Sequence, residues 1–187
     1  ALSGEAQSSW QRQSTEHAIR FATTFPRHPQ AMAVLTRSSE QLLARHDQAR
    51  AILVAETVIS SEQASAEQQR VAWTVLAHAH FDLQDYLQAE SAYQQVRQKM
   101  SPTSKNYNAI NERLAASIYK QGEAAQAAGD TVAAVDHYQR VRQATPDASI
   151  VATAEFDAAA GLLAMQDWTE ATAVLERFRN NHPNDPR

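Results

Sequence analysis

The residues with the strongest potential for metal chemistry are His78, His80 and Asp82, which lie within five consecutive positions. Residues three or four positions apart share one face of a helix, so His78 and Asp82 would point the same way and His80 would not. A protein zinc site takes at least three protein ligands. One histidine and one carboxylate fall short of that number, and we therefore expect no metal ion here.

The sequence contains none of the short motifs that mark common catalytic or nucleotide-binding sites. It lacks His-Glu-x-x-His, Gly-x-Ser-x-Gly and a glycine-rich phosphate loop. Gly122 and Gly129 lie seven positions apart in a helical stretch, which indicates helix packing and helix ending rather than a phosphate cradle. We expect no catalytic residue, no enzyme activity and no cofactor.

The composition favours an all-α fold. Apolar residues make up 43% of the 187 residues, with only 4 Gly and 6 Pro. Ala, Gln, Glu, Arg and Leu are abundant and favour helices. The net charge is −4 without a basic block, so we expect no nucleic-acid partner. No apolar run reaches the roughly 18 residues of a membrane span.

Short segments with an aspartate between two helices recur along the chain. Three of them read small or polar residue, Asp, a larger residue, two variable residues and Ala, namely Gln84–Ala89, Gly129–Ala134 and Gln166–Ala171. The first position can end one helix, and the aspartate can accept hydrogen bonds from the free N–H groups of the next. A weaker fourth segment predicts a second helix with Ala49 and Leu53, in which Ala49 would take the position of the crossing alanine.

Two helix ends share a proline pattern. Residues 20–29 and 177–186 both read Arg-Phe, four residues, Pro, two residues, Pro. Proline cannot continue a helix, so each pattern predicts a helix end.

Three longer segments resemble the tetratricopeptide repeat, whose pattern is Trp-xx-Leu-Gly-xx-Tyr, then Ala-xxx-Phe, then Pro. In the first segment His80 stands where the family prefers Tyr. The second and third segments are closed by Pro146 and Pro183. The matching positions are Trp73, Leu76, Ala77, His80, Ala89 and Tyr93; Ile118, Gln121, Gly122, Ala125, Ala134 and Tyr138; and Glu155, Ala158, Ala159, Leu162, Ala171 and Leu175.

The resemblance implies a right-handed superhelical solenoid of antiparallel helix-turn-helix repeats, with a concave face lined by the first helix of each pair. We expect one domain over residues 1–187, with a half repeat at 8–26 and repeats at 30–60, 63–100, 105–146 and 148–183. The expected helices are 8–24, 30–44, 47–60, 63–83, 86–100, 105–128, 131–144, 148–164 and 168–181.

The repeats are unequal in length. From Ala49 the repeat alanines follow at spacings of 40, 45 and 37 residues, against a family period of 34. Ser101 to Asn111 is therefore either a longer connection or part of a lengthened first helix.

The aromatic residues fall into two groups under this alignment. The first group occupies core positions and consists of Trp73, Tyr93, Tyr138, Trp168 and Phe178. The second group, Phe81, Tyr119 and Phe156, falls where the family faces its concave groove, with Thr74, His78, Glu123 and Gln126 as polar neighbours. Exposed aromatics there would anchor a peptide or helix. Alternatively, the longer first helices shift the phase and bury them.

The resemblance implies a protein–protein interaction or scaffolding module that binds a peptide, a helix or a partner domain. The proline-closed ends and irregular lengths are similar to the bacterial cell-envelope subgroup, which includes outer-membrane assembly lipoproteins and Tol–Pal-associated proteins. That subgroup implies a periplasmic or outer-membrane-associated location, with the cytoplasm as the alternative.

The alternative function is a structural spacer or self-association segment within a secretion or polysaccharide-export protein. The chain starts with half a repeat and shows no capping helix after the last one, so we expect a fragment of a longer array. Its solenoid ends could then associate with one another.

Overall fold

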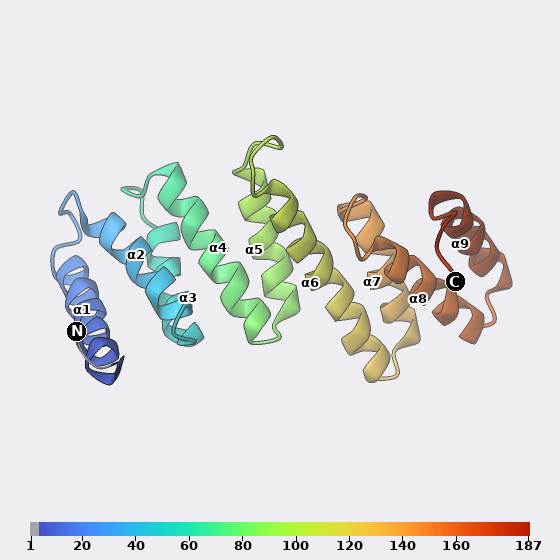
Figure 1. Cartoon of the computed structure of the whole chain (residues 1–187), viewed down its shortest axis with the longest axis horizontal. Helices are drawn as coiled ribbons and strands as arrows, with labels where there is room; N and C mark the ends of the chain where they lie inside the picture. The colour runs from blue at the N-terminus through green and yellow to red at the C-terminus, as the bar shows by residue number, and fades with distance from the viewer. Residues whose placement is uncertain (1–3) are drawn as a thin grey trace. The chain divides into compact units, whose positions relative to one another are not determined.

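The computed structural model describes residues 4–187, and within them the chain forms α-helices and no strand (Figure 1). The prediction of an all-α repeat fold is confirmed, and each expected helix is present with ends shifted by a few residues. The helices are α1 (Gly4–Thr24), α2 (Ala31–Leu43), α3 (Gln48–Ile59), α4 (Ala66–Asp82), α5 (Tyr86–Gln98), α6 (Tyr107–Ala127), α7 (Thr131–Ala144), α8 (Val151–Ala164) and α9 (Trp168–Asn181).

The helices group into two compact units, Ala1–Lys99 and Met100–Arg187. In unit 1, α2 packs against α1, α3 and α4, and α5 packs against α4. In unit 2, the helices α6 to α9 pack each against the next. The expectation of one domain over residues 1–187 stays a prediction, and residues 1–3 lie outside the described part of the chain.

The turn between the two helices of each repeat uses the same backbone motif. The residue before each aspartate is left-handed, with φ of 59° at His46, 63° at Gln84, 80° at Gly129 and 62° at Gln166. The amide of the following aspartate then donates to a carbonyl five residues back, as in the 2.9 Å bond from Asp85 to His80. This pairing is the Schellman ending of a helix, which usually takes glycine. Only one of the four turns has a glycine at this position, Gly129.

The aspartates begin the second helices as the sequence predicts, although two of them lack a capping bond. Asp130 Oδ1 accepts from the amide of Ala133 at 3.0 Å, and Asp167 Oδ1 accepts from that of Glu170 at 3.1 Å. The Asp85 carboxylate instead lies 3.2 Å from His80 Nδ1. A helix therefore starts at each aspartate even where the side chain bonds elsewhere.

The alanine four positions after each aspartate is where two helices cross, and all four such alanines are at most 2% exposed. The assignment of Ala49 to this position was wrong, because Ala49 is exposed and the buried residue is Ala51. Counting from Asp47 corrects the first spacing, since Ala51 to Ala89 is 38 residues. Leu53 lies in α3 as predicted but is 63% exposed.

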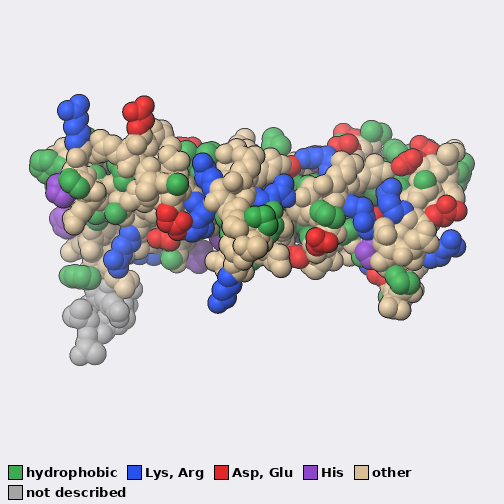
Figure 2. Space-filling model, turned by 90° about the horizontal axis from the view of Figure 1, so that it is seen from above, with side chains coloured by type: hydrophobic (Ala, Val, Ile, Leu, Met, Phe, Trp, Pro, Cys, Tyr) green, Lys and Arg blue, Asp and Glu red, His purple; other side chains and the backbone are tan. Residues whose placement is uncertain are grey.

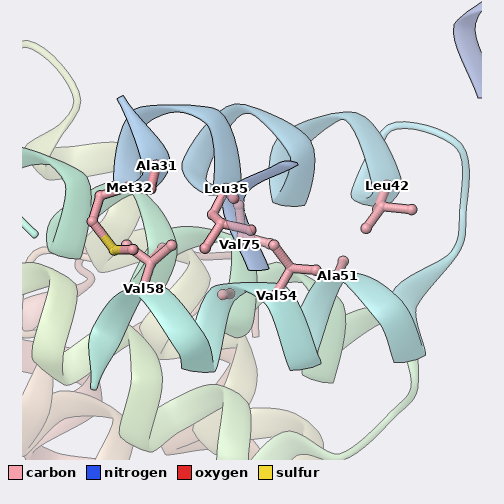
Figure 3. Packing of buried hydrophobic residues seen from close by; sticks show 11 residues of the cluster. Ala31, Met32, Leu35, Leu42, Ala51, Val54, Val58 and Val75 are labelled. Atoms are coloured by element: carbon pink, nitrogen blue, oxygen red, sulfur yellow. The ribbon is translucent and has the colours of Figure 1, made fainter. Parts of the chain in front are cut away.

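The core of unit 1 lies between α2, α3 and α4. Leu35 of α2 points toward Val54 and Val58 of α3, and Val75 of α4 closes the cluster (Figure 3). Val58 is fully buried. Burying each such side chain stabilises the fold by about 1.5–3 kcal/mol. These buried contacts are therefore a main source of stability for the repeat.

In unit 2 the first helix is lengthened. α6 starts at Tyr107 and runs 21 residues, so each interpretation of Ser101 to Asn111 holds in part: residues 101–106 belong to the connection and residues 107–111 to the lengthened helix. Gly122 on α6 allows Tyr138 of α7 to approach, because a Cβ at Gly122 would lie 2.5 Å from Tyr138 Cε1. The predicted helix-packing role of Gly122 is therefore confirmed.

Three of the five predicted core aromatics are buried, one is half-buried and one is exposed. Tyr93, Tyr138 and Phe178 are at most 6% exposed and Trp73 is half-buried, but Trp168 is 61% exposed. The core assignment of Trp168 was wrong. Trp168 is the first residue of α9, one position after the capping Asp167, and the inward position of that turn is taken by the smaller Ala171.

Candidate protein-binding face

The two first helices of unit 2 are joined by a side-chain hydrogen bond. Tyr119 of α6 donates its hydroxyl to Asp157 Oδ2 of α8 at 2.6 Å, and both residues are half-buried. Burial, the bond to Asp157 and the nearby negative charges raise the pKa of Tyr119 above its ordinary value. The phenol therefore stays a neutral donor, and the bond holds the α6 and α8 faces side by side.

Tyr138 of α7 lies beneath this bond. Its ring is 5.2 Å from that of Tyr119, and its hydroxyl donates to Gln126 Oε1 at 2.7 Å. Burial, with the charges of Asp157 and Glu123, raises the pKa of Tyr138 as well. Glu123 itself pairs with Lys120 at 2.5 Å. The predicted residues Glu123 and Gln126 thus lie close to the pair that Tyr119 forms with Tyr138.

Phe156 of α8 extends the same face toward α9. Its ring lies 6.1 Å from Phe178, and the guanidinium carbon of Arg187 lies 5.3 Å from its centroid. In the sequence, Phe156 directly precedes Asp157, which accepts the hydrogen bond from Tyr119. Four of the seven predicted site residues, Tyr119, Glu123, Gln126 and Phe156, therefore lie on adjoining parts of unit 2.

The other three predicted residues lie on α4 in unit 1 and are half-buried. Thr74 donates its hydroxyl back to the carbonyl of Arg70 at 2.9 Å. The His78 ring lies 5.7 Å from Tyr93, and the Phe81 ring meets Tyr86 edge-on at 5.3 Å. The ring contacts hold His78 and Phe81 against α5, whereas the Thr74 hydroxyl bonds within α4. Part of each side chain remains at the surface.

The face is suited to contact and hydrogen bonding. Among residues 4–187, no three His, Cys, Asp or Glu side chains come together to hold a metal ion. Figure 2, which views the protein from above relative to Figure 1, shows acidic and basic side chains interspersed over that side of the molecule. Over the same stretch of chain, every helix is too short or too polar to cross a bilayer. The prediction that these residues bind a partner stays a prediction.

A buried ion cluster in unit 2 was missed by the sequence reasoning. Glu155 of α8 is 2% exposed and pairs with Arg142 of α7, Arg177 of α9 at 3.2 Å and His182 at 3.0 Å. Burial alone would raise the pKa of Glu155, but the bonds from Arg142, His182 and Arg177 outweigh it and hold the pKa below its ordinary value. The signal was a glutamate where the other repeats carry Trp73 and Ile118. The cluster ties three helices together.

Two other surface features were also missed. A cleft of about 660 Å³ lies between α1 and α2, with the 65% exposed Trp10 on its wall. At the α8–α9 corner, Leu163, Met165 and Trp168 are 40%, 37% and 61% exposed. Neither feature follows from the family alignment, which assigns Trp168 to the core and leaves Trp10 without a position.

Comparison with known proteins gives a family match for two of these hairpins. Residues 116–148 and 153–185 match the family model described as Tetratricopeptide repeat. No curated protein matches the chain. TPR-like repeats assigned to a kinesin light chain of Podosopora anserina share 16% identity over 97% of this chain and 92% of theirs, with a TM-score of 0.48. A variant of those repeats shares 16% identity over 94% of this chain and 88% of its own, with a TM-score of 0.49. BtubC (BKLC) from P. vanneervenii shares 14% identity over 100% of this chain and 96% of its own, with a TM-score of 0.38.

The matched ranges coincide with structural hairpins. Residues 116–148 take in most of α6 and all of α7, and residues 153–185 take in α8 and α9. The first nine residues of α6 precede the match, as expected if that helix is longer than the family's. Both hairpins of unit 2 thus match the model of the tetratricopeptide repeat family.

Proposed function

We propose that this protein is an interaction module that binds a peptide, helix or partner domain on the face formed by α6 and α8. Tetratricopeptide repeats mediate contacts between proteins and typically serve as non-enzymatic scaffolds. The observation that carries the proposal is the Tyr119–Asp157 bond, which brings the first helices of two successive repeats to one face. No catalytic step is part of the proposal.

The chemistry of the face supports this function. Tyr119 and Phe156 are half-buried aromatic side chains held by neighbours, so they offer contact area at a small entropic cost. Partly exposed, well-packed aromatics are the residue types that dominate binding energy at protein interfaces. We extend the proposal to Thr74, His78 and Phe81, which would form the corresponding surface of unit 1.

A pull-down with the Tyr119→Ala/Phe156→Ala double variant tests the proposal. The matched control is Val132→Ala/Glu176→Ala, which removes two exposed side chains of the same unit away from both the α6–α8 face and the α8–α9 corner. We expect the first variant to lose partners that the wild type and the control retain, with all three proteins equally helical by circular dichroism. Equal recovery of partners by both variants contradicts the proposal.

A second candidate is self-association, and the α8–α9 corner favours it. Leu163, Met165 and Trp168 expose apolar surface there, which marks association sites more often than isolated residues do. Sedimentation velocity over a concentration series would show an oligomer that Leu163→Ser/Trp168→Ala dissolves. A wild type that stays monomeric at every concentration rules this candidate out.

A bacterial cell-envelope setting remains part of the proposal. It is supported by the prolines that follow the second helices, as at Pro146 and Pro183, and by the unequal repeat lengths. Fractionation of the source cells, with an antibody against this chain, tests it. Recovery of the protein only in the cytoplasmic fraction would exclude the periplasmic and outer-membrane locations.

A further inference from the structure

An arginine side chain already rests on part of the candidate face. The Arg187 guanidinium donates through Nε and Nη2 to the two carboxylate oxygens of Asp185, at 2.9 and 2.7 Å. Its carbon lies 5.3 Å from the Phe156 centroid and 5.6 Å from that of Phe178. Nη1 is 3.4 Å from Thr153 Oγ1. A planar cation is therefore held by a carboxylate fork and two aromatic rings.

The surroundings of this cation carry further negative charge. The pKa of Arg187 is raised, first through its hydrogen bonds to Asp185 and also through the charges of Asp157 and Tyr119 when ionised. The bond that Asp157 accepts comes from the Tyr119 hydroxyl, which is neutral. Within the described part of the chain, Asp157 has no ion pair with a basic side chain. The site thus keeps a carboxylate charge that an incoming cation can use.

We propose that Thr153, Phe156, Asp157, Phe178 and Asp185 form a binding site for an arginine side chain of the partner protein, and that Arg187 occupies this site in the free protein. The five residues are called the arginine site below. This inference rests on the proposed function, because it names the side chain that the α6–α8 face recognises.

The geometry selects a guanidinium over an ammonium. A guanidinium is flat, so it can lie against the Phe156 and Phe178 rings and still direct two N–H groups at one carboxylate. A lysine ammonium is compact and more strongly hydrated, and it can make only part of this set of contacts. The Arg187 contacts already use both the fork and the rings.

The arrangement also makes Arg187 replaceable. Its side chain is 32% exposed in the pair with Asp185, and ion pairs in contact with water are weak. Because Arg187 belongs to the same chain, it competes with a partner's arginine and lowers the apparent affinity of the site. The contact is therefore autoinhibitory, and removing Arg187 should open the site without altering its other residues.

The test is an NMR titration of the full chain with N-acetyl-arginine amide. We expect the amides of Thr153, Phe156 and Asp157 to shift, and Arg187→Gln to bind about threefold or more tightly than the wild type because the competitor is gone. N-acetyl-citrulline amide has the same shape without the charge, and it should leave these amides unmoved. N-acetyl-lysine amide should bind more weakly than the arginine probe.

Matched variants in the Arg187→Gln background locate the binding. Asp157→Asn should weaken binding of the arginine probe, and Phe156→Leu should do the same by removing one ring. Asp136→Asn makes the same charge change at an exposed position of α7 and should have no effect. Unchanged amide spectra away from the site would show that each variant is folded, so a loss of binding can be assigned to the side chain.

The outcomes separate this inference from the proposed function. Equal affinity of wild type and Arg187→Gln, equal binding of the lysine probe, or insensitivity to Asp157→Asn would each overturn the arginine site. If the pull-down still shows partners that depend on Tyr119 and Phe156, the interaction function stands without the arginine site. If the probe binds as expected and no partner depends on the face, the site stands and the proposed function fails.

Discussion

Tyr119 and Asp157 lie 38 residues apart in the sequence, yet their side chains share the 2.6 Å bond between α6 and α8. Glu112 makes a second bridge of the same kind, since its carboxylate accepts from the amide and hydroxyl of Ser149 at 2.9 and 2.7 Å. Both links run from the first helix of one repeat to the start or face of the next. The surface of α6 and α8 is therefore held as a unit.

Removing the Tyr119 hydroxyl should weaken unit 2. Tyr119→Phe leaves the ring contact with Tyr138 and deletes the donor to a half-buried carboxylate, which should lower the free energy of unfolding by about 1–2 kcal/mol. Urea denaturation measures the change. Tyr107→Phe, at the start of the same helix, is the control and should be close to neutral. Equal stability of the two variants would mean that the bond contributes nothing.

The same bond should make the protein sensitive to alkali. The folded state raises the pKa of Tyr119, so its neutral form is favoured by folding. That contribution is complete below the ordinary tyrosine pKa of about 10 and is lost as the pH rises above it, because the unfolded chain releases its proton first. The free energy of unfolding should fall more steeply above that pH in the wild type than in Tyr119→Phe. Tyr138, whose pKa is also raised, accounts for the slope that remains.

The sequence predicted the features that depend on residues close together in the chain, namely the helix starts and most core positions. Asp130 and Asp167 predicted helix starts, because a capping side chain bonds to the first turn of the helix that follows it. Tyr93 and Tyr138 were correctly placed in the core, because their positions follow the period of the helix. Trp168 was misplaced because a residue beside the cap can point outward while still matching the pattern. Local signals therefore fixed the hairpins better than the direction of individual side chains.

Contacts between repeats were beyond local reasoning. Glu155 forms ion pairs with Arg142, Arg177 and His182, which lie outside its own helix. No short sequence pattern relates these four residues. The family alignment proposed Tyr119 and Phe156 as residues of the face, but it did not predict their contacts with Asp157 and Arg187. The predicted site was thus a set of positions, and the structure supplied the interactions among them.

Neutralising Glu155 should destabilise the packing of α7, α8 and α9. Glu155→Gln leaves Arg142 and Arg177 facing a buried neutral amide, which should cost about 2–4 kcal/mol, somewhat below a fully buried pair because the arginines are partly exposed. The exposed Glu176→Gln on α9 is the control. The pKa of Glu155 is lowered on folding, so the stability it provides is present above its unfolded pKa and is lost as the pH falls through the folded value. Acid titration of unfolding should show a larger loss of stability in the wild type than in Glu155→Gln.

Adding a methyl group at Gly122 should oppose the usual effect of alanine in a helix. Alanine is about 1 kcal/mol more favourable than glycine in a helix interior. At Gly122, however, its Cβ would lie 2.5 Å from Tyr138 Cε1, and the buried ring has little room to move. We expect Gly122→Ala to lower the free energy of unfolding by about 1–3 kcal/mol. Ser91→Ala, at an exposed position of α5, should be neutral or slightly stabilising. A stabilised Gly122→Ala protein would show that α6 and α7 separate easily.

Glycine at Gln84 should instead stabilise the protein. Gln84 has a φ of 63°, a conformation that costs an L-residue about 1–2 kcal/mol and costs glycine little. Its amide bond to Phe81 belongs to the backbone and would survive the change. Gln84→Gly should therefore raise the free energy of unfolding by about 1 kcal/mol. Gln95→Gly, in the middle of α5, should lower it by a similar amount, because a helix interior disfavours glycine. The opposite signs of the same substitution 11 residues apart, measured by urea denaturation, would establish that the hairpin corner stores strain. A loss of stability in both variants would show that Gln84 makes side-chain contacts worth more than the strain.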